Sequence, residues 1–155
     1  MDKKEFIKTV SKFITGITIV TLGDSKKGFY GCTMNSFTSL SLNPPQILFC
    51  VDNRNSFIKE FKRNTLVNIN ILSDKQKDLS NKFASSPELR WKDTKFKVSK
   101  NDVPFFQDSL VVIETVIDKK IFSGDHLIII CGLRKIIHLK KGNPLVYFEG
   151  KYLSL

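Results

Sequence analysis

Apolar and polar positions along the chain alternate in a way that predicts many short strands and few helices. In residues 2–13 the apolar positions recur at helical spacing, with Asp2 at the N-cap position and Glu5 three residues later, which predicts an amphipathic helix. Apolar segments of strand length then follow one another, separated by glycine, proline or polar turn residues. The predicted strands cover residues 17–22, 29–34, 36–41, 46–52, 65–72, 109–122 and 126–139, followed by a short pair at 145–148 and 152–153.

Two further short helices are predicted between the strands. Asn55 or Ser56 can cap the first, which carries apolar side chains at 57, 58 and 61, and Asp74 opens the second. Residues 84–107 show no regular period and are expected to be mostly loop. Many short strands with tight turns are typical of an antiparallel barrel. We therefore predict a mainly β fold, a closed Greek-key-like antiparallel barrel, in a single domain covering residues 1–155.

The cysteines and the apolar runs exclude several classes of protein. Cys32, Cys50 and Cys131 lie in separate strand segments without a C-x-x-C pair, so they are predicted to be buried free thiols rather than disulfides or zinc ligands. The two histidines have no further nitrogen or thiolate ligand at metal spacing, and no metal site is expected. The apolar runs are too short to cross a bilayer and none follows the charged start, which predicts a cytoplasmic protein without a membrane anchor.

The formal net charge of +10 is spread along the chain rather than gathered in one segment. The most closely spaced lysine pairs, such as Lys26-Lys27 and Lys140-Lys141, fall at predicted turns or strand ends. The sequence shows no basic helix and no aromatic RNA-binding motif. Nucleic acid is therefore not an expected partner. A solvated positive surface, or attraction for phosphorylated ligands, accounts for the charge.

Residues 31–41 combine small and hydroxyl-bearing side chains in what is predicted to be strand. Such a segment could place hydrogen-bond donors on one face and allow a planar ligand to approach the backbone closely. A Ser/Thr-rich edge strand fits the same pattern. The pattern alone does not separate these two interpretations.

Two other segments could carry chemistry. His126 enters an apolar strand directly from a glycine–aspartate turn, and it is either a functional group or an ordinary half-buried side chain. Residues 51–56 run from a strand end to a helix start, where backbone N–H groups, the Ser56 hydroxyl, Arg54 and Lys59 could bind a phosphate. The glycine motifs of Rossmann and P-loop sites and the serine-hydrolase elbow are absent, so the chemistry must come from a bound cofactor.

Taken in order, these segments resemble the short-chain flavin reductase family, the reductase components of two-component flavin monooxygenases. Residues 13–21, FITGITIVT, are similar to the family's F-x-T-G-V-x-V-V-T opening, and residues 31–45, GCTMNSFTSLSLNPP, to its G-x-T-x-x-S-F-x-S-V-S-x-x-P-P signature. Further matches follow at VNINIL, KFA, GDH and PLVY. The resemblance runs from residue 13 to residue 152 in the family's order.

The resemblance implies an FMN-binding split β-barrel, normally a homodimer with the flavin near the subunit interface. It implies an NAD(P)H-dependent flavin reductase that passes hydride from NADH or NADPH to FMN or FAD, with a separate oxygenase as one destination for the reduced flavin. His126 would lie beside the flavin ring where the nicotinamide stacks, and Asp125 would orient that histidine or its turn. The residues that would bind the flavin are Thr33, Met34, Asn35, Ser36, Phe37, Ser39, Ser41, Val51, Asp52, Ser56, Phe83 and Ala84.

Three alternatives remain open at the level of the sequence. A flavin-binding protein without reductase activity could use the same barrel, because a fold does not fix a function. A nucleic-acid-binding barrel is motivated by charge alone. An oxidase of a pyridoxal-type phosphate shares the general barrel, but the Gly124-Asp125-His126 turn favours the reductases.

Overall fold

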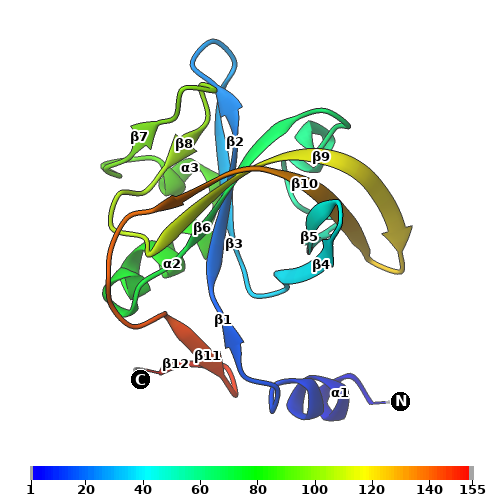
Figure 1. The fold of residues 1–155 in the computed structure, drawn as a ribbon. Coiled ribbons are helices and arrows are strands. Elements are labelled where there is room, and N and C mark those ends of the chain that lie inside the picture. Colours follow the sequence, from blue (N-terminus) through cyan, green and yellow to red (C-terminus); the bar gives the residue numbers. More distant parts are fainter. Residues whose placement is uncertain (1, 154–155) are drawn as a thin grey trace.

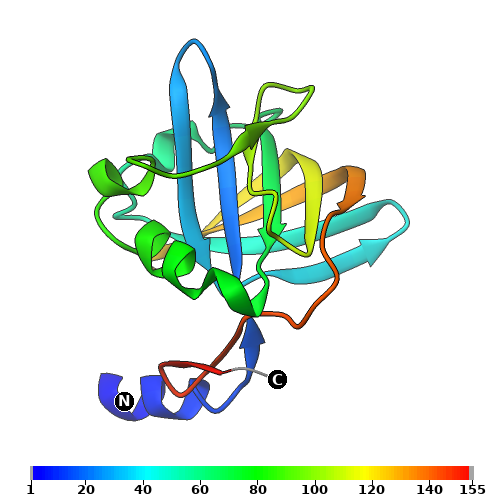
Figure 2. The same cartoon turned by 90° about the vertical axis from the view of Figure 1, so that its left-hand side faces the viewer.

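The computed structural model describes residues 2–153 and is mainly β, with a small arm that projects from the sheet (Figure 1 and Figure 2). A seven-stranded antiparallel sheet has the order β3-β2-β6-β9-β10-β5-β4. Each predicted strand is present, with its ends shifted by at most a few residues. The strands of this sheet are β2 (Thr18–Asp24), β3 (Gly28–Met34), β4 (Thr38–Leu42), β5 (Pro45–Asp52), β6 (Leu66–Ile71), β9 (Val111–Ser123) and β10 (His126–His138).

The sheet is open between β3 and β4, which form its two edges. The closed barrel predicted from the strand pattern is therefore wrong, and the barrel is split. Strand β4 pairs with β5 only as far as Leu48, so the backbone of Cys50 has no ladder partner on that side. The Ser36 hydroxyl takes the place of the missing strand, since it accepts from the Cys50 N–H (2.9 Å) and donates to the Cys50 carbonyl (3.1 Å).

Side-chain alternation along β5 and β10 builds the main core. Ile47, Phe49 and Val51 are buried and belong to one cluster with Leu127 and Ile129. The intervening side chains of β5 point to the opposite face, as period-2 geometry requires.

The three cysteines follow this division of the sheet. Cys32 and Cys131 are buried as predicted, and burial raises the pKa of each thiol to about 12. The expectation that Cys50 lies in the core is wrong, because its position in β5 faces away from the core and leaves it half-buried.

The VNINIL segment of β6 contributes apolar side chains to the core on one face of the sheet and amide side chains on the other. Val67 and Ile69 enter the core, whereas Asn68 and Asn70 face the loop that leads to β9. The Asn68 amide donates to the carbonyls of residues 103 and 104 (3.2 and 3.3 Å), and the Asn70 oxygen accepts from the Phe106 N–H (3.0 Å). Two buried amides thus hold an otherwise irregular segment, which includes the two-residue strands β7 (Lys97–Val98) and β8 (Pro104–Phe105).

Both helices predicted between the strands are present. The first is a single 3₁₀ turn, η1 (Ile58–Glu60), whose approach is fixed by the Asn55 side chain accepting from the Phe57 N–H (3.0 Å). The second begins at Asp74 as predicted, with a capping box between Ser73 and Gln76, and continues through η2 (Asp74–Gln76) into α2 (Lys77–Ala84). A further short helix, α3 (Pro87–Arg90), lies in the segment expected to be loop.

Helix α2 approaches β3 closely because Gly31 has no side chain. Phe83 of α2 is fully buried and contacts Trp91 and Phe106 edge to face. A Cβ atom at residue 31 would lie 2.7 Å from Phe83 Cε1 and 3.2 Å from Trp91 Cζ2. The aromatic cluster therefore fixes how α2 sits over the edge strand.

Gly31→Ala is expected to lower the free energy of unfolding by about 1–3 kcal/mol, the usual cost of overpacking. Gly132→Ala is the matched control, because a Cβ there would meet only Val116 Cγ1 at 3.9 Å. Urea unfolding of both variants measures the difference. Equal stability of the two variants would contradict the close packing of Phe83 against β3.

The arm consists of α1 (Lys3–Val10) and a three-stranded sheet of β1 (Thr15–Gly16), β11 (Val146–Phe148) and β12 (Lys151–Leu153). Asp2 caps α1 as predicted, but the helix ends at Val10, and it contains no buried residue. The Glu149 N–H donates to the Ser11 carbonyl (3.0 Å), and Lys12 pairs with the Glu149 carboxylate. None of the helices in the described part of the chain has the length and apolar character needed to cross a membrane.

Candidate functional site

A pocket of about 330 Å³ opens where the end of β3, the end of β5, the start of β10 and the end of α2 meet. It lies beside the open edge of the sheet. A larger groove, of about 710 Å³, lies along α2, but its walls are mostly lysine and aspartate, and it is lined by none of the residues that the sequence nominated. The smaller pocket is lined by Cys32, Thr33, Met34, Asn35, Ser36, Cys50, Val51, Asp52, Asn55, Phe83, Ala84, Arg90 and His126.

The pocket brings together most of the residues that the sequence nominated, and their roles toward flavin stay predictions. Those present are Thr33, Met34, Asn35, Ser36, Val51, Asp52, Phe83, Ala84 and His126. Four nominated residues are not among its walls. Ser39 and Ser41 lie in β4, opposite the far end of β5, and Phe37 packs against the main core. Ser56 precedes η1, which is too short to offer the helix start expected there.

Two hydroxyl groups that were expected to face a ligand are occupied within the protein. The Thr33 hydroxyl donates to the Ser80 carbonyl (2.6 Å). The Ser36 hydroxyl is hydrogen-bonded to both the N–H and the carbonyl of Cys50. Backbone groups of β3 are available to a ligand, because as an edge strand β3 has no ladder partner on its outer side. The side chain of Asn35, just after β3, adds an amide to the same wall.

His126 follows a turn, Gly124-Asp125, that is bonded to Asn53 in the loop after β5. Its Nδ1 atom lies 2.7 Å from the Asp125 carboxylate. The Asn53 N–H donates to the Asp125 carbonyl (2.9 Å), and the Asn53 side-chain amide to the Gly124 carbonyl (3.4 Å). The imidazole is about half-exposed, at the rim of the pocket.

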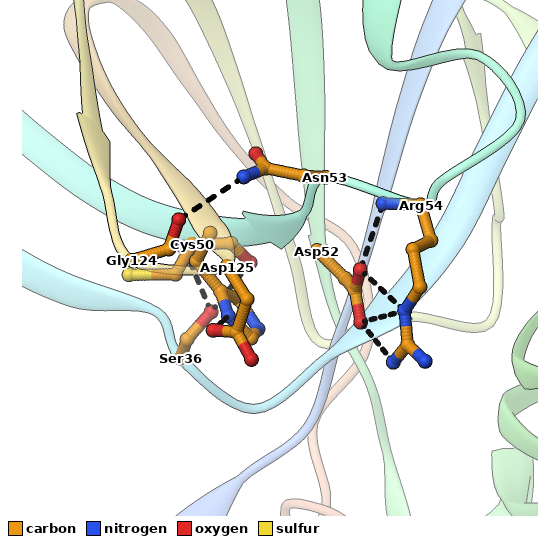
Figure 3. Close-up of polar contacts among 8 residues, drawn as sticks. Ser36, Cys50, Asp52, Asn53, Arg54, Gly124 and Asp125 are labelled. Atoms are coloured by element: carbon orange, nitrogen blue, oxygen red, sulfur yellow. Dashed lines mark hydrogen bonds and ion pairs between the residues drawn. The ribbon is translucent and has the colours of Figure 1, made fainter.

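Asp52, at the rim of the pocket, forms a salt bridge with Arg54 (Figure 3). The Asp52 carboxylate accepts from the Arg54 backbone N–H (2.8 Å), from Nε (3.1 and 3.2 Å) and from Nη2 (2.6 Å). These bonds hold the pKa of Asp52 well below its usual range, and the bond to His126 lowers the pKa of Asp125. Both carboxylates are therefore ionised at neutral pH, and the charge of Arg54 is largely balanced by its neighbour.

Arg90 is the main site residue that sequence reasoning missed. Its guanidinium donates to the Gly31 carbonyl (2.8 Å) and twice to the Ser85 carbonyl (3.0 and 2.7 Å), and it lies over the Phe57 ring at 5.8 Å. Desolvation lowers its pKa, yet it stays a cation. A guanidinium has five N–H groups, so donors remain for a ligand. The local signal for Arg90 was weak, since it lies in a segment without periodicity.

The remaining chemistry of the pocket is limited. Burial raises the pKa of the Cys32 thiol, against the weaker effect of Arg90, and also raises that of Cys50, so neither is a thiolate at neutral pH. Within residues 2–153, no group of three or more histidine, cysteine, aspartate or glutamate side chains is placed to hold a metal ion. The pocket therefore offers hydrogen-bond donors and one fixed guanidinium, but its own side chains supply no nucleophile.

The open antiparallel sheet, with a pocket beside its edge strand β3, defines the class of small split-barrel proteins. The family model described as "Flavin reductase like domain" matches residues 10–155. The chain therefore belongs to the flavin reductase-like family.

Named relatives agree with this assignment. A "Probable flavin reductase" of Rhizobium meliloti is 37% identical over 99% of this chain, and an "NADH:FMN oxidoreductase" of Rhodococcus qingshengii is 34% identical over 88%. The reductase subunit HsaB of a flavin-dependent monooxygenase of Mycobacterium tuberculosis is 27% identical over the whole chain. The matches cover 49%, 73% and 83% of these three relatives, so the chain spans about half the length of the first.

A solved structure shows the same architecture. The flavin reductase PheA2 in its native state superimposes with a TM-score of 0.88 at 30% identity, covering 100% of this chain and 99% of that one. The mainly β, antiparallel fold predicted from the sequence is confirmed by this likeness and by the strand order.

Proposed function

We propose that this chain binds FMN or FAD in the edge-strand pocket and reduces it with NADH or NADPH. The observation that carries the proposal is the meeting of three features in one pocket: an unpaired strand edge, a fixed half-buried cation and an oriented imidazole. Apolar side chains, including Met34 and Phe83, complete the walls. This donor set fits a flavin, which when bound would supply the hydride-accepting chemistry.

Arg90 binds the flavin phosphate in this proposal. Gly31 and Ser85 hold its guanidinium in place before the ligand arrives, so little side-chain entropy is lost on binding. The outer edge of β3 hydrogen-bonds the polar edge of the ring, and Phe83-Ala84 closes over it. The positive net charge assists the encounter with both anionic ligands.

His126 positions the nicotinamide against the flavin. Because Nδ1 is bonded to Asp125, Nε2 is the ring nitrogen that remains to contact the carboxamide. A hydride moves without prior deprotonation, so the contribution of His126 is orientation rather than acid–base catalysis.

The proposal also covers the acceptor of the reduced flavin and the cellular compartment of the protein. The relative that is a monooxygenase reductase subunit supports a separate oxygenase as the acceptor of reduced flavin. Three free cysteines agree with a reducing compartment such as the cytoplasm.

The arm supports a homodimer. Phe6 and Val10 of α1 are 53% and 50% exposed, and Phe13, just after the helix, is 79% exposed, although a group of large apolar side chains is normally covered. We propose that a second copy of the chain covers this face, since a face repeated in each copy suits a twofold interface. Sedimentation should show a dimer that Val10→Asp weakens and Thr9→Asp, on the same exposed helix, does not. A monomeric wild-type protein at micromolar concentration would contradict this interface.

Steady-state kinetics test the proposed function. Purified protein should oxidise NADH or NADPH only when FMN or FAD is added, and riboflavin should be a poorer substrate because it has no phosphate for Arg90. Oxidation at the same rate without any flavin, or none with either flavin, would contradict the proposal.

A further inference from the structure

A tyrosine of the arm is joined to the pocket through one buried serine. The Tyr152 hydroxyl in β12 lies 2.8 Å from the Ser80 hydroxyl, and Ser80 is completely buried in α2. On its other side, the Ser80 carbonyl accepts the Thr33 hydroxyl of β3 at 2.6 Å. Ser80 thus links the arm to the strand edge at which the ligand is proposed to bind.

This link acts on the element that carries part of the pocket wall. Phe83 and Ala84 lie about one turn after Ser80 in the same helix, and both line the pocket together with Thr33. Phe83 has no room to move toward β3, because Gly31 is already in close contact with its ring. The hydrogen bond between Tyr152 and Ser80 adds a polar contact one turn before Phe83, in the middle of α2.

We propose that Tyr152 is a positioning residue, which holds α2 and Thr33 in the geometry that binds flavin. The inference rests on the proposed function. Tyr152 does not line the pocket, so its effect on the ligand passes through Ser80. It also gives the projecting arm a role in the site, because β12 pairs with β11 and stands in the same sheet as β1, next to α1.

Removing the phenol hydroxyl leaves the buried Ser80 hydroxyl without its partner. The serine then competes for a backbone carbonyl of its own helix, which bends helices at such positions. A lost neutral hydrogen bond of this kind corresponds to a change of roughly 3- to 10-fold in an equilibrium constant. We expect a shift of that size in the dissociation constant of FMN.

Tyr152→Phe tests the proposal, with Tyr147→Phe as the matched control. Tyr147 pairs with Tyr152 across the arm sheet, and the two rings are 5.3 Å apart, but its hydroxyl has no hydrogen bond to the rest of residues 2–153. FMN titrations of the full-length variants give the dissociation constants, and the visible circular dichroism of bound FMN reports the pocket geometry. Thermal unfolding is recorded alongside.

Tyr152→Phe should weaken FMN binding and change the dichroism of the bound flavin, whereas Tyr147→Phe should do neither. Ser80→Ala should weaken binding similarly, and the double variant Tyr152→Phe/Ser80→Ala should be no worse than either single one. A lower melting temperature with unchanged FMN binding and dichroism would overturn the proposal, since it would show a structural role only. Failure of the wild-type protein to bind FMN would instead contradict the proposed function.

Discussion

Arg90→Met is expected to weaken FMN binding by about 10- to 100-fold, the value of a charge-assisted hydrogen bond to a phosphate. The guanidinium is fixed by Gly31 and Ser85, and no other arginine or lysine is among the residues that line the pocket. Methionine retains much of the apolar length of the side chain, so packing against Phe57 is preserved better than with alanine. Fluorescence titration with FMN measures the change.

Riboflavin separates the proposed role of Arg90 from a structural one. Because riboflavin has no phosphate, its affinity should change by less than about 3-fold in Arg90→Met. Arg54→Met is the matched control, since Arg54 is exposed and engaged by Asp52. Equal losses for FMN and riboflavin would show that Arg90 only holds the loop, and no loss for FMN would remove it from the site.

His126→Ala is expected to lower kcat/KM for NADH by about 10- to 100-fold, because a misplaced hydride donor reacts slowly. FMN affinity should stay within a factor of about 3 of wild type, since the phosphate contact is assigned to Arg90. Stopped-flow reduction of preformed protein–FMN complex at varied NADH concentration separates nicotinamide binding from the reduction step.

His138→Ala is the control for that experiment. It removes the other histidine, which is exposed at the opposite end of β10, across from Val111. Its reduction kinetics should match those of the wild-type protein. If His126→Ala also reduces FMN with unchanged rate and unchanged NADH dependence, the nicotinamide does not stack where Asp125 holds the imidazole.

The elements that could be predicted are those whose pattern is local. Strand alternation specified β5 and β10 almost to the residue, and the Gly-Asp-His turn was found with its carboxylate on the imidazole. The cap at Asp2 was also read from neighbouring residues. In these segments the local conformational propensity and the spacing of apolar side chains favour the same secondary structure. Contacts with distant segments are therefore not needed to determine it.

The site residues that sequence reasoning missed or misjudged depend on contacts between distant segments. Arg90 is placed by carbonyls of β3 and of residue 85, and by the aromatic packing of Trp91 next to it. The Ser36 hydroxyl was predicted to face a ligand. Instead it hydrogen-bonds the backbone of Cys50, which has no strand partner because β4 does not extend that far. Sheet closure cannot be read from strand pattern, because the same alternation suits an open and a closed barrel.

Anaerobic titration of the protein–FMN complex with NADH and NADPH tests the central claim most directly. The account predicts that FMN binds, with a visible spectrum altered by the pocket, and that at least one nicotinamide bleaches it at a rate well above that of free FMN. A complex that binds FMN and is bleached no faster than the free flavin would make the chain a flavin-binding protein rather than a reductase. Absence of any FMN or FAD binding would contradict the flavin site itself.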